Sequence, residues 1–141
     1  MFRESLAQDQ EKKIKRSDLL PGVQKAVAEQ SQGATIRGFS EEKENGQTFF
    51  EAELIVKGHS KDVLMDSAGN VVEVEEQIPT DSLSPTVRDG LQAKAGNGKL
   101  IKVETLTKKG KLVAYEAQVL TDGRKSEVQV GPDGKPLDHE E

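Results

Sequence analysis

The sequence contains no cysteine and no tryptophan, and no stretch of it is apolar for long enough to span a membrane. Without cysteine the chain can form no disulfide, thiolate zinc site or cysteine nucleophile. A membrane-spanning helix needs about 20 mostly apolar residues, so we predict no membrane span. Basic residues are not in excess either, because 20 Lys and Arg stand against 25 Asp and Glu, for a net charge of -5. This balance argues against nucleic-acid binding, which depends on a positive surface.

Apolar residues make up only 33% of the chain, but they gather in periodic blocks and therefore predict a folded protein with small cores. Residues 1–17 are polar and contain a short basic run, so we expect a solvated N-terminal arm. Within this arm, Ser5 and Ala7 are small residues with the spacing that a signal peptidase reads. We therefore expect an exported protein, periplasmic or secreted, whose leader is absent from this chain.

Hydrophobic spacing predicts a helix followed by four strands, and then the same order again. Val23, Ala26 and Val27 recur at helical spacing in residues 20–30. The pair Ser84-Pro85 provides an N-cap and a first turn for the second helix, which ends before Gly96. Period-two blocks separated by turn residues predict strands at residues 35–40, 48–57, 61–66 and 71–75, and again at 99–107, 112–121, 125–130 and 135–138.

The two halves of the sequence align with each other. Residues 50–54 match residues 115–119, and Gly69 matches Gly134, at an offset of 65, whereas the helices match at an offset of 64. We expect the extra residue in the loop between helix and strand. This internal similarity predicts an α+β fold of two tandem α-β-β-β-β repeats, residues 18–80 and 81–141, after the arm at 1–17.

The short motifs are a helix opened by Leu-Pro and a small residue, the strands at residues 50–54 and 115–119, and closing hairpins at 66–72 and 131–137. They resemble the PepSY-like superfamily, and over residues 18–139 their tandem form resembles the fold of the β-lactamase inhibitory proteins. The resemblance implies antiparallel sheets that form one curved surface, with both helices packed on the opposite face. It also implies an exported bacterial protein that inhibits or modulates a protease or another enzyme. Those inhibitors carry disulfides, which this chain cannot form, so no β-lactamase target is implied.

Alternation along the strands assigns each residue to one of two faces. The face toward the helices is predicted to form the core, with Phe50, Ala52, Leu54, Val56, Val63, Met65, Val72, Ile101, Val103, Tyr115, Ala117, Val119, Val128, Val130 and Leu137. The opposite face, here called the outer face, is predicted to carry Arg37, Phe39, Phe49, Glu51, Glu53, Ile55, Asp62, Leu64 and Glu73 from the first half, and Lys102, Glu104, Leu106, Glu116, Gln118, Leu120, Glu127 and Gln129 from the second.

The mixture of carboxylates and large apolar groups on the outer face allows more than one interpretation. It is an ordinary solvated sheet face, which antiparallel sheets often have. Alternatively it is a protein-binding surface, because its apolar residues would form a larger exposed patch than monomers usually leave. Self-association is the third interpretation. The carboxylates would favour a basic or mixed-charge partner.

Candidate catalytic and metal-binding residues do not combine into a site. His59 and His139 lack a second histidine at metal-ligand spacing. Residues 40–43 match a Ser-x-x-Lys nucleophile motif, but at the end of a hairpin instead of the start of a helix. Glu51 and Glu53 share a strand face, where we expect them to be hydrated. A buried carboxylate pair in a cleft would instead indicate an enzyme.

We therefore predict a non-enzymatic protein-binding module without metal or cofactor, which inhibits or modulates an extracytoplasmic enzyme such as a protease through the outer face. The alternative is a module that senses a small ligand or peptide in a groove between the repeats or at an exposed sheet edge. Charge reversal at Glu51 and Glu116 distinguishes the two, because it should weaken a binder of the outer face and leave an edge binder unaffected.

Overall fold

The computed structural model describes residues 10–141, and its contacts divide the chain into two compact units, Met1–Glu75 and Glu76–Glu141. No helix in this described part is both long and apolar enough to cross a membrane. Ser5 and Ala7, on which the export prediction depends, lie outside the described residues. In chain order the elements are β1 (Gln10–Ile14), η1 (Arg16–Asp18), α1 (Pro21–Gln30), β2 (Thr35–Glu44), β3 (Gln47–Val56), β4 (His59–Asp66), β5 (Val71–Ile78), η2 (Thr80–Ser82), α2 (Pro85–Ala95), β6 (Lys99–Lys108), β7 (Lys111–Thr121) and β8 (Arg124–Val130).

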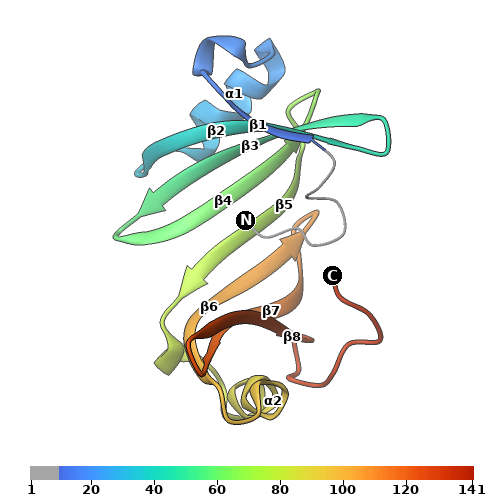
Figure 1. Cartoon of the computed structure of the whole chain (residues 1–141). Helices are drawn as coiled ribbons and strands as arrows, with labels where there is room; N and C mark the ends of the chain where they lie inside the picture. The colour runs from blue at the N-terminus through green and yellow to red at the C-terminus, as the bar shows by residue number, and fades with distance from the viewer. Residues whose placement is uncertain (1–9) are drawn as a thin grey trace. The chain divides into compact units, whose positions relative to one another are not determined.

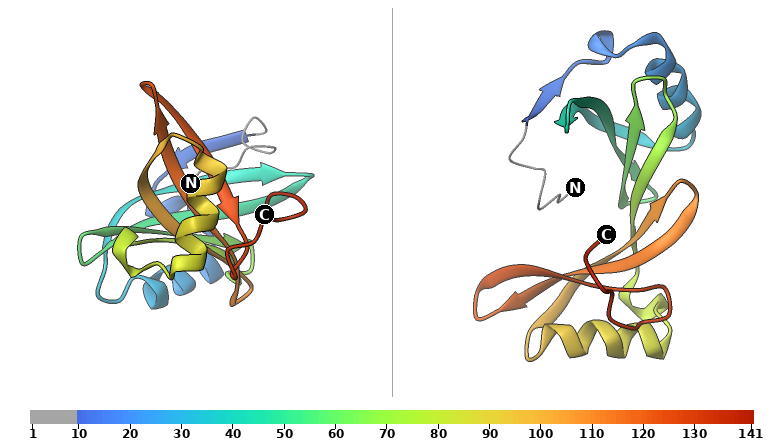
Figure 2. Two further views of the ribbon diagram at one scale, coloured as in Figure 1. Left: turned by 90° about the horizontal axis from the view of Figure 1, so that it is seen from below. Right: turned by 90° about the vertical axis from the view of Figure 1, so that its right-hand side faces the viewer.

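The prediction of two tandem α-β-β-β-β repeats is wrong, because the strands join in chain order into one eight-stranded antiparallel sheet (Figure 1). Gln10–Ile14, which the sequence places in a solvated arm, forms β1 and pairs with β2. Residues 135–138 form no strand, and Figure 2 shows the chain beyond β8 as a loop. Pro136 lacks the backbone N–H that a strand ladder requires, which disfavours a strand there.

In the first unit, α1 packs against the sheet through one apolar face. Val23, Ala26 and Val27 are buried, as their spacing predicts. Fully burying a valine side chain stabilises the folded state by about 1.5–3 kcal/mol. The rest of this buried cluster consists of Leu19, Phe39, Phe50, Ala52, Leu54, Val63 and Met65.

In the second unit, α2 lies along β6, β7 and β8 (Figure 2). The predicted N-cap is confirmed, because the Ser84 side chain accepts a hydrogen bond from the Val87 backbone N–H at 3.3 Å. The buried cluster consists of Leu83, Val87, Leu91, Val103, Ala117 and Val130, with Tyr115 and Val128 packed against it.

A β-bulge near the start of β2 and of β6 changes which residues face the helices. The pairing of β2 with β3 skips Arg37, and that of β6 with β7 skips Ile101. Because a bulge adds one residue, the alternation reverses beyond it. Phe39 is therefore 8% exposed in the core, so its predicted place on the outer face is wrong. Leu100 packs against the core of the second unit instead of Ile101, which is 37% exposed.

The tight turns show where the two units differ in length. Two turns 64 residues apart have similar positive φ angles: 53° and 79° in Asn45-Gly46, and 49° and 80° in Lys109-Gly110. The next two turns are 65 residues apart, with φ angles of 49° and 85° in Lys57-Gly58 and of 50° and 80° in Asp122-Gly123. The extra residue therefore lies on β7, where the pairing with β6 skips Val113. Our prediction of an insertion between helix and strand is wrong.

Each unit also has a glycine turn that touches its helix. Gly69 follows β4 with a φ of 93°, and a Cβ there would overlap the carbonyl oxygen of Gly22 in α1. Gly134 follows β8 with a φ of 85°, and a Cβ there would overlap the carbonyl oxygen of Thr86 in α2. Glycine is favoured at both positions for two reasons: it tolerates a positive φ, and it has no Cβ that would overlap the helix backbone.

Candidate functional site

The pairing register defines which side chains share the outer face. In the first unit, Ser40, Glu51 and Leu64 lie opposite one another across β2, β3 and β4. The next row contains Glu53 and Asp62, which also lie directly opposite each other. In antiparallel strands such pairs project from the same face at close range, so the register brings these carboxyl groups together.

Much of the outer face is buried, contrary to the predicted hydrated carboxylates and exposed apolar patch. Glu51 is 2% exposed, Leu64 2% and Glu116 5%. Glu104 and Leu106 are buried as well, whereas Phe49, Glu53, Ile55, Lys102 and Gln118 are half-buried, and Arg37 and Leu120 are exposed. Because Phe39 and Leu64 are buried, the predicted apolar patch reduces to the partly accessible Phe49 and Ile55 and the exposed Leu120.

Glu51 lies among other acidic groups in the first unit. Its Oε1 accepts a hydrogen bond from the Ser40 hydroxyl at 3.5 Å, and its Oε2 is buried without a hydrogen-bond partner among residues 10–141. Burial, above all, and the charges of Asp62, Glu42 and Glu11 raise the pKa of Glu51 to about 8. This carboxyl is therefore neutral at pH 7.

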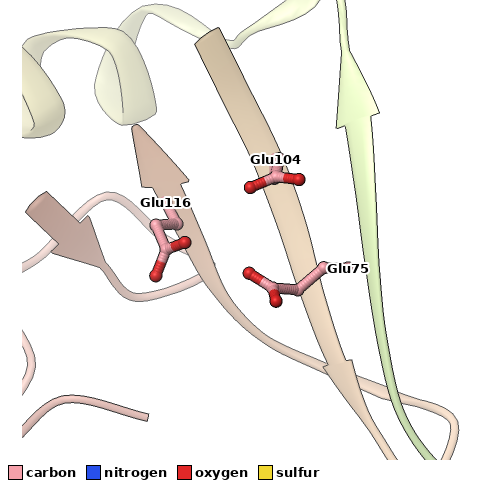
Figure 3. A group of neighbouring side chains, drawn as sticks. All are labelled: Glu75, Glu104 and Glu116. Atoms are coloured by element: carbon pink, nitrogen blue, oxygen red, sulfur yellow. The ribbon is translucent and has the colours of Figure 1, made fainter. Parts of the chain in front are cut away.

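The second unit has a comparable acidic group on β6, β7 and β8. Glu104 lies opposite Glu116, and their carboxylate oxygens approach within 4.8 Å (Figure 3). Glu75, also labelled there, lies on β5, the strand in which the boundary between the units falls. The Gln129 side-chain N–H donates to Glu116 Oε2 at 2.8 Å. Burial, then the hydrogen bond to Glu116 and the charges of Glu116 and Glu104, raise the pKa of Glu127 to about 8.

Glu127, which is half-buried, lines a small cavity. The cavity beside Glu127 measures about 130 Å³ and reaches Lys94 and His139. Small-molecule sites usually measure about 300–1,000 Å³, so this cavity is too small for a typical substrate. Carboxylates often gather without a bound ion, and we assign no metal site to this group.

A wider hollow of about 610 Å³ lies between α2 and β6. Two of its polar side chains already bind backbone carbonyls. Gln92 donates to Gly96 and Gly98 at 3.1 and 2.9 Å, and Arg88 donates to Thr80 at 3.3 Å. These groups stabilise the ends of α2 and are not aimed at a ligand.

The accessible part of the outer face in the second unit surrounds Leu120. This side chain is 37% exposed, and its strand neighbours are Lys99 on β6 and Lys125 on β8, both exposed. Lys102 and Gln118 form the adjacent, half-buried row. Lys99 and Lys125 were not among the predicted site residues, because no spacing in the sequence places them beside Leu120. Only the strand register does so.

No family model matches the sequence, and no curated protein matches it. A DUF2874 family protein from Bacteroides ovatus is 22% identical, with a TM-score of 0.65 over 85% of this chain and 86% of that one. A BLIP-like protein from Bacteroides fragilis is 20% identical, with a TM-score of 0.61 over 86% of each chain. A "putative periplasmic" protein from Bacteroides eggerthii is 16% identical, with a TM-score of 0.68 over 84% of this chain and 86% of that one. The chain thus has a BLIP-like fold, in agreement with the resemblance to the β-lactamase inhibitory proteins.

Proposed function

We propose that this chain is a non-enzymatic protein-binding module that acts through the outer face of its sheet. The observation that carries the proposal is the exposed Leu120 between Lys99 and Lys125. An apolar centre with a charged, solvated rim is the usual composition of a protein interface, and strands hold such a group in a fixed place. The small cavity beside Glu127 argues against a role as an enzyme.

The similar folds suggest the kind of partner and the compartment. The description of the Bacteroides fragilis protein as BLIP-like supports a role in inhibiting or modulating an extracytoplasmic enzyme, such as a protease. The description of the Bacteroides eggerthii protein supports a periplasmic location. Membership of the PepSY-like superfamily is part of the same proposal.

The accessible charges favour an acidic surface on the partner around an apolar group. Our sequence-based expectation of a basic or mixed-charge partner depends on carboxylates such as Glu51 and Glu116, which are 2% and 5% exposed. The exposed cations Lys99 and Lys125 are instead the charged groups that a partner meets beside Leu120. Complementary charge at such a rim mainly raises the rate of association.

The structure also changes the variants that test this proposal. Lysine at Glu51 or Glu116 would place a charge in a buried site and disrupt folding, so charge reversal there cannot report on binding. We propose the variants Lys99→Glu with Lys125→Glu, and Leu120→Ser separately. The control is Lys111→Glu, an exposed residue at the other end of β7.

The measurement is capture of partners from an extract of the source organism's envelope, followed by the Kd of the purified partner and its inhibition. The expected result is a partner that binds the wild type and the control equally and both test variants at least about tenfold more weakly, as for interface residues worth more than about 1 kcal/mol. Equal binding by all four proteins would exclude this surface.

The exposed sheet edge remains the second candidate, because β8 ends the sheet and the described residues after it form no strand. An extended peptide could add a strand along this edge. A peptide bound there would tolerate Leu120→Ser. It would be displaced by Pro136→Val, which restores an N–H and lets the following residues compete for the same edge.

A further inference from the structure

The two units bury acidic residues at corresponding places. Glu51 lies six residues before Lys57, and Glu116 six before Asp122, in turns of the same geometry. Asp62 and Glu127 each lie five residues after those turn residues. In both units, therefore, a buried glutamate on the middle strand has a second acidic residue diagonally across from it on the next strand, on the face away from the helix.

Few cations face Glu51 in the first unit. Its outer-face neighbours include Glu11 on β1, Glu42 on β2 and Asp62 on β4, and their charges act on it unfavourably. Lys13 lies opposite Ser40, so a strand separates it from Glu51. The remaining acidic side chains of this unit's sheet that are buried are Glu44, Glu73 and Glu75. Ionising Glu51 would therefore put a charge into a buried site in which, among residues 10–141, its Oε2 has no hydrogen-bond partner.

The second unit has the same imbalance. Glu104, Glu116 and Glu127 bring three carboxyls together, and Lys102 lies 3.7 Å from Glu104. The next lysines on this face, Lys99 and Lys125, flank Leu120. The Oε1 atoms of Glu116 and Glu127 are buried and receive no N–H. Two carboxylates close together repel each other, so the neighbouring Glu116 favours the protonated form of Glu127. The other charged or titratable groups near Glu127 line the small cavity and are Lys94 of α2 with His139 and Glu140 of the C-terminal segment.

We propose that each unit binds one proton on its outer face, at Glu51 in the first and at Glu127, beside Glu116, in the second, and that the sheet loses stability as the pH rises toward the range in which these protons leave. The proton is the ligand of both sites. Its loss adds one negative charge to each acidic group, in which the neighbouring carboxylates already act unfavourably on an ionised glutamate. The fold thus carries a matched pair of pH-sensitive elements.

The direction of the effect follows from the raised pKa values of Glu51 and Glu127, both about 8. In the unfolded chain these groups titrate near 4.5. Between these values the folded protein retains protons that the unfolded chain has lost. Below pH 4.5, therefore, these two groups make their full contribution to the free energy of unfolding. As the pH rises toward 8 this contribution falls, and the equilibrium constant for unfolding rises by up to about tenfold per pH unit for each group.

The test compares urea unfolding of the full chain at pH 6 and pH 9 with that of Glu51→Gln, Glu127→Gln and the double variant. Glutamine resembles the protonated carboxyl in shape and carries no charge. Each single variant should therefore unfold at a higher urea concentration than the wild type already at pH 6, the difference should be larger at pH 9, and the double variant should gain most. Glu53→Gln, on the same face of β3 but half-buried, is the control and should show no such gain.

Carboxyl carbon NMR titration of the wild type measures the two sites without any substitution. Resonances of Glu51 and Glu127 that shift near pH 8 support the proposal, and shifts confined to pH 4 to 5 overturn it. Variants that lose stability equally at both pH values also contradict it. Because neither experiment involves a partner, a negative result here leaves the proposed binding function untouched.

Discussion

Single side chains fix the start of α2 and the turn after β4. Ser84 accepts the Val87 N–H at 3.3 Å, and Asp66 accepts the N–H groups of Ala68 and Asn70 at 3.0 and 2.9 Å. Although burial opposes the shift, these hydrogen bonds hold the pKa of Asp66 below its usual range. Both residues satisfy backbone donors that would otherwise lack a partner within their element.

Replacing Ser84 with Ala should destabilise the protein by about 1 kcal/mol, because the N–H of Val87 loses its acceptor. Urea unfolding at a fixed pH measures the effect. Ser84→Asp retains an acceptor at the same place and should restore most of the loss. If the alanine and aspartate variants were equally unstable, the hydrogen bond would not be the cause.

Burial of polar groups is the property that the sequence predicts least well. Ser84 and its role are predictable, because an N-cap depends on residues within one turn of the chain. Glu51 carries no comparable local signal: alternation correctly places it away from the helix, but its burial depends on its partners on β2 and β4. The sequence therefore predicts correctly which residues of β3 lie on the outer face. Its prediction that Glu51 is hydrated there is wrong.

At the level of the elements, helices and turns follow the sequence closely, whereas strand ends and faces depend on pairing. Asn45-Gly46 and Lys109-Gly110 form tight turns in the gaps between predicted strands, where Gly favours the positive φ. The bulges that skip Arg37 and Ile101 have no clear composition signal, and one unpaired residue was enough to reverse the predicted face of Phe39.

The contacts between each helix and its glycine turn should be sensitive to a single methyl group. Gly69→Ala and Gly134→Ala each add a Cβ that overlaps a backbone carbonyl of the helix, at a positive φ that alanine disfavours. We expect a loss of about 2–4 kcal/mol from strain and displacement of the helix. Thermal and urea unfolding measure it. Gly46→Ala, where φ is also positive but nothing lies within 4 Å, separates the conformational cost from the overlap.

At the scale of the whole chain, strand order follows sequence order throughout the sheet. In the first unit β3 lies between two paired neighbours, and in the second β7 does, whereas β1 and β8 end the sheet. Backbone amides that are bonded on both sides of a strand open only with larger unfolding events.

Hydrogen exchange should therefore be slowest in β3 and β7 and faster in β1 and β8. Mass spectrometry of peptides from residues 47–56, 111–121 and 124–130 compares these strands directly. Amides of β8 that exchange as slowly as those of β7 would show that its outer edge is covered, and would remove the support for peptide addition at that edge.

The strictly sequential strand order has a consequence for how the chain reaches its native state. Neighbouring strands are joined either by a tight turn or by a segment that contains one short helix, so each pairing closes a small loop. Loop closure of this kind costs little entropy, and chains with mostly local pairings fold quickly. Each hairpin can form as soon as its second strand is available, so assembly can follow the chain from one end to the other and leaves few long-range pairings to be found last.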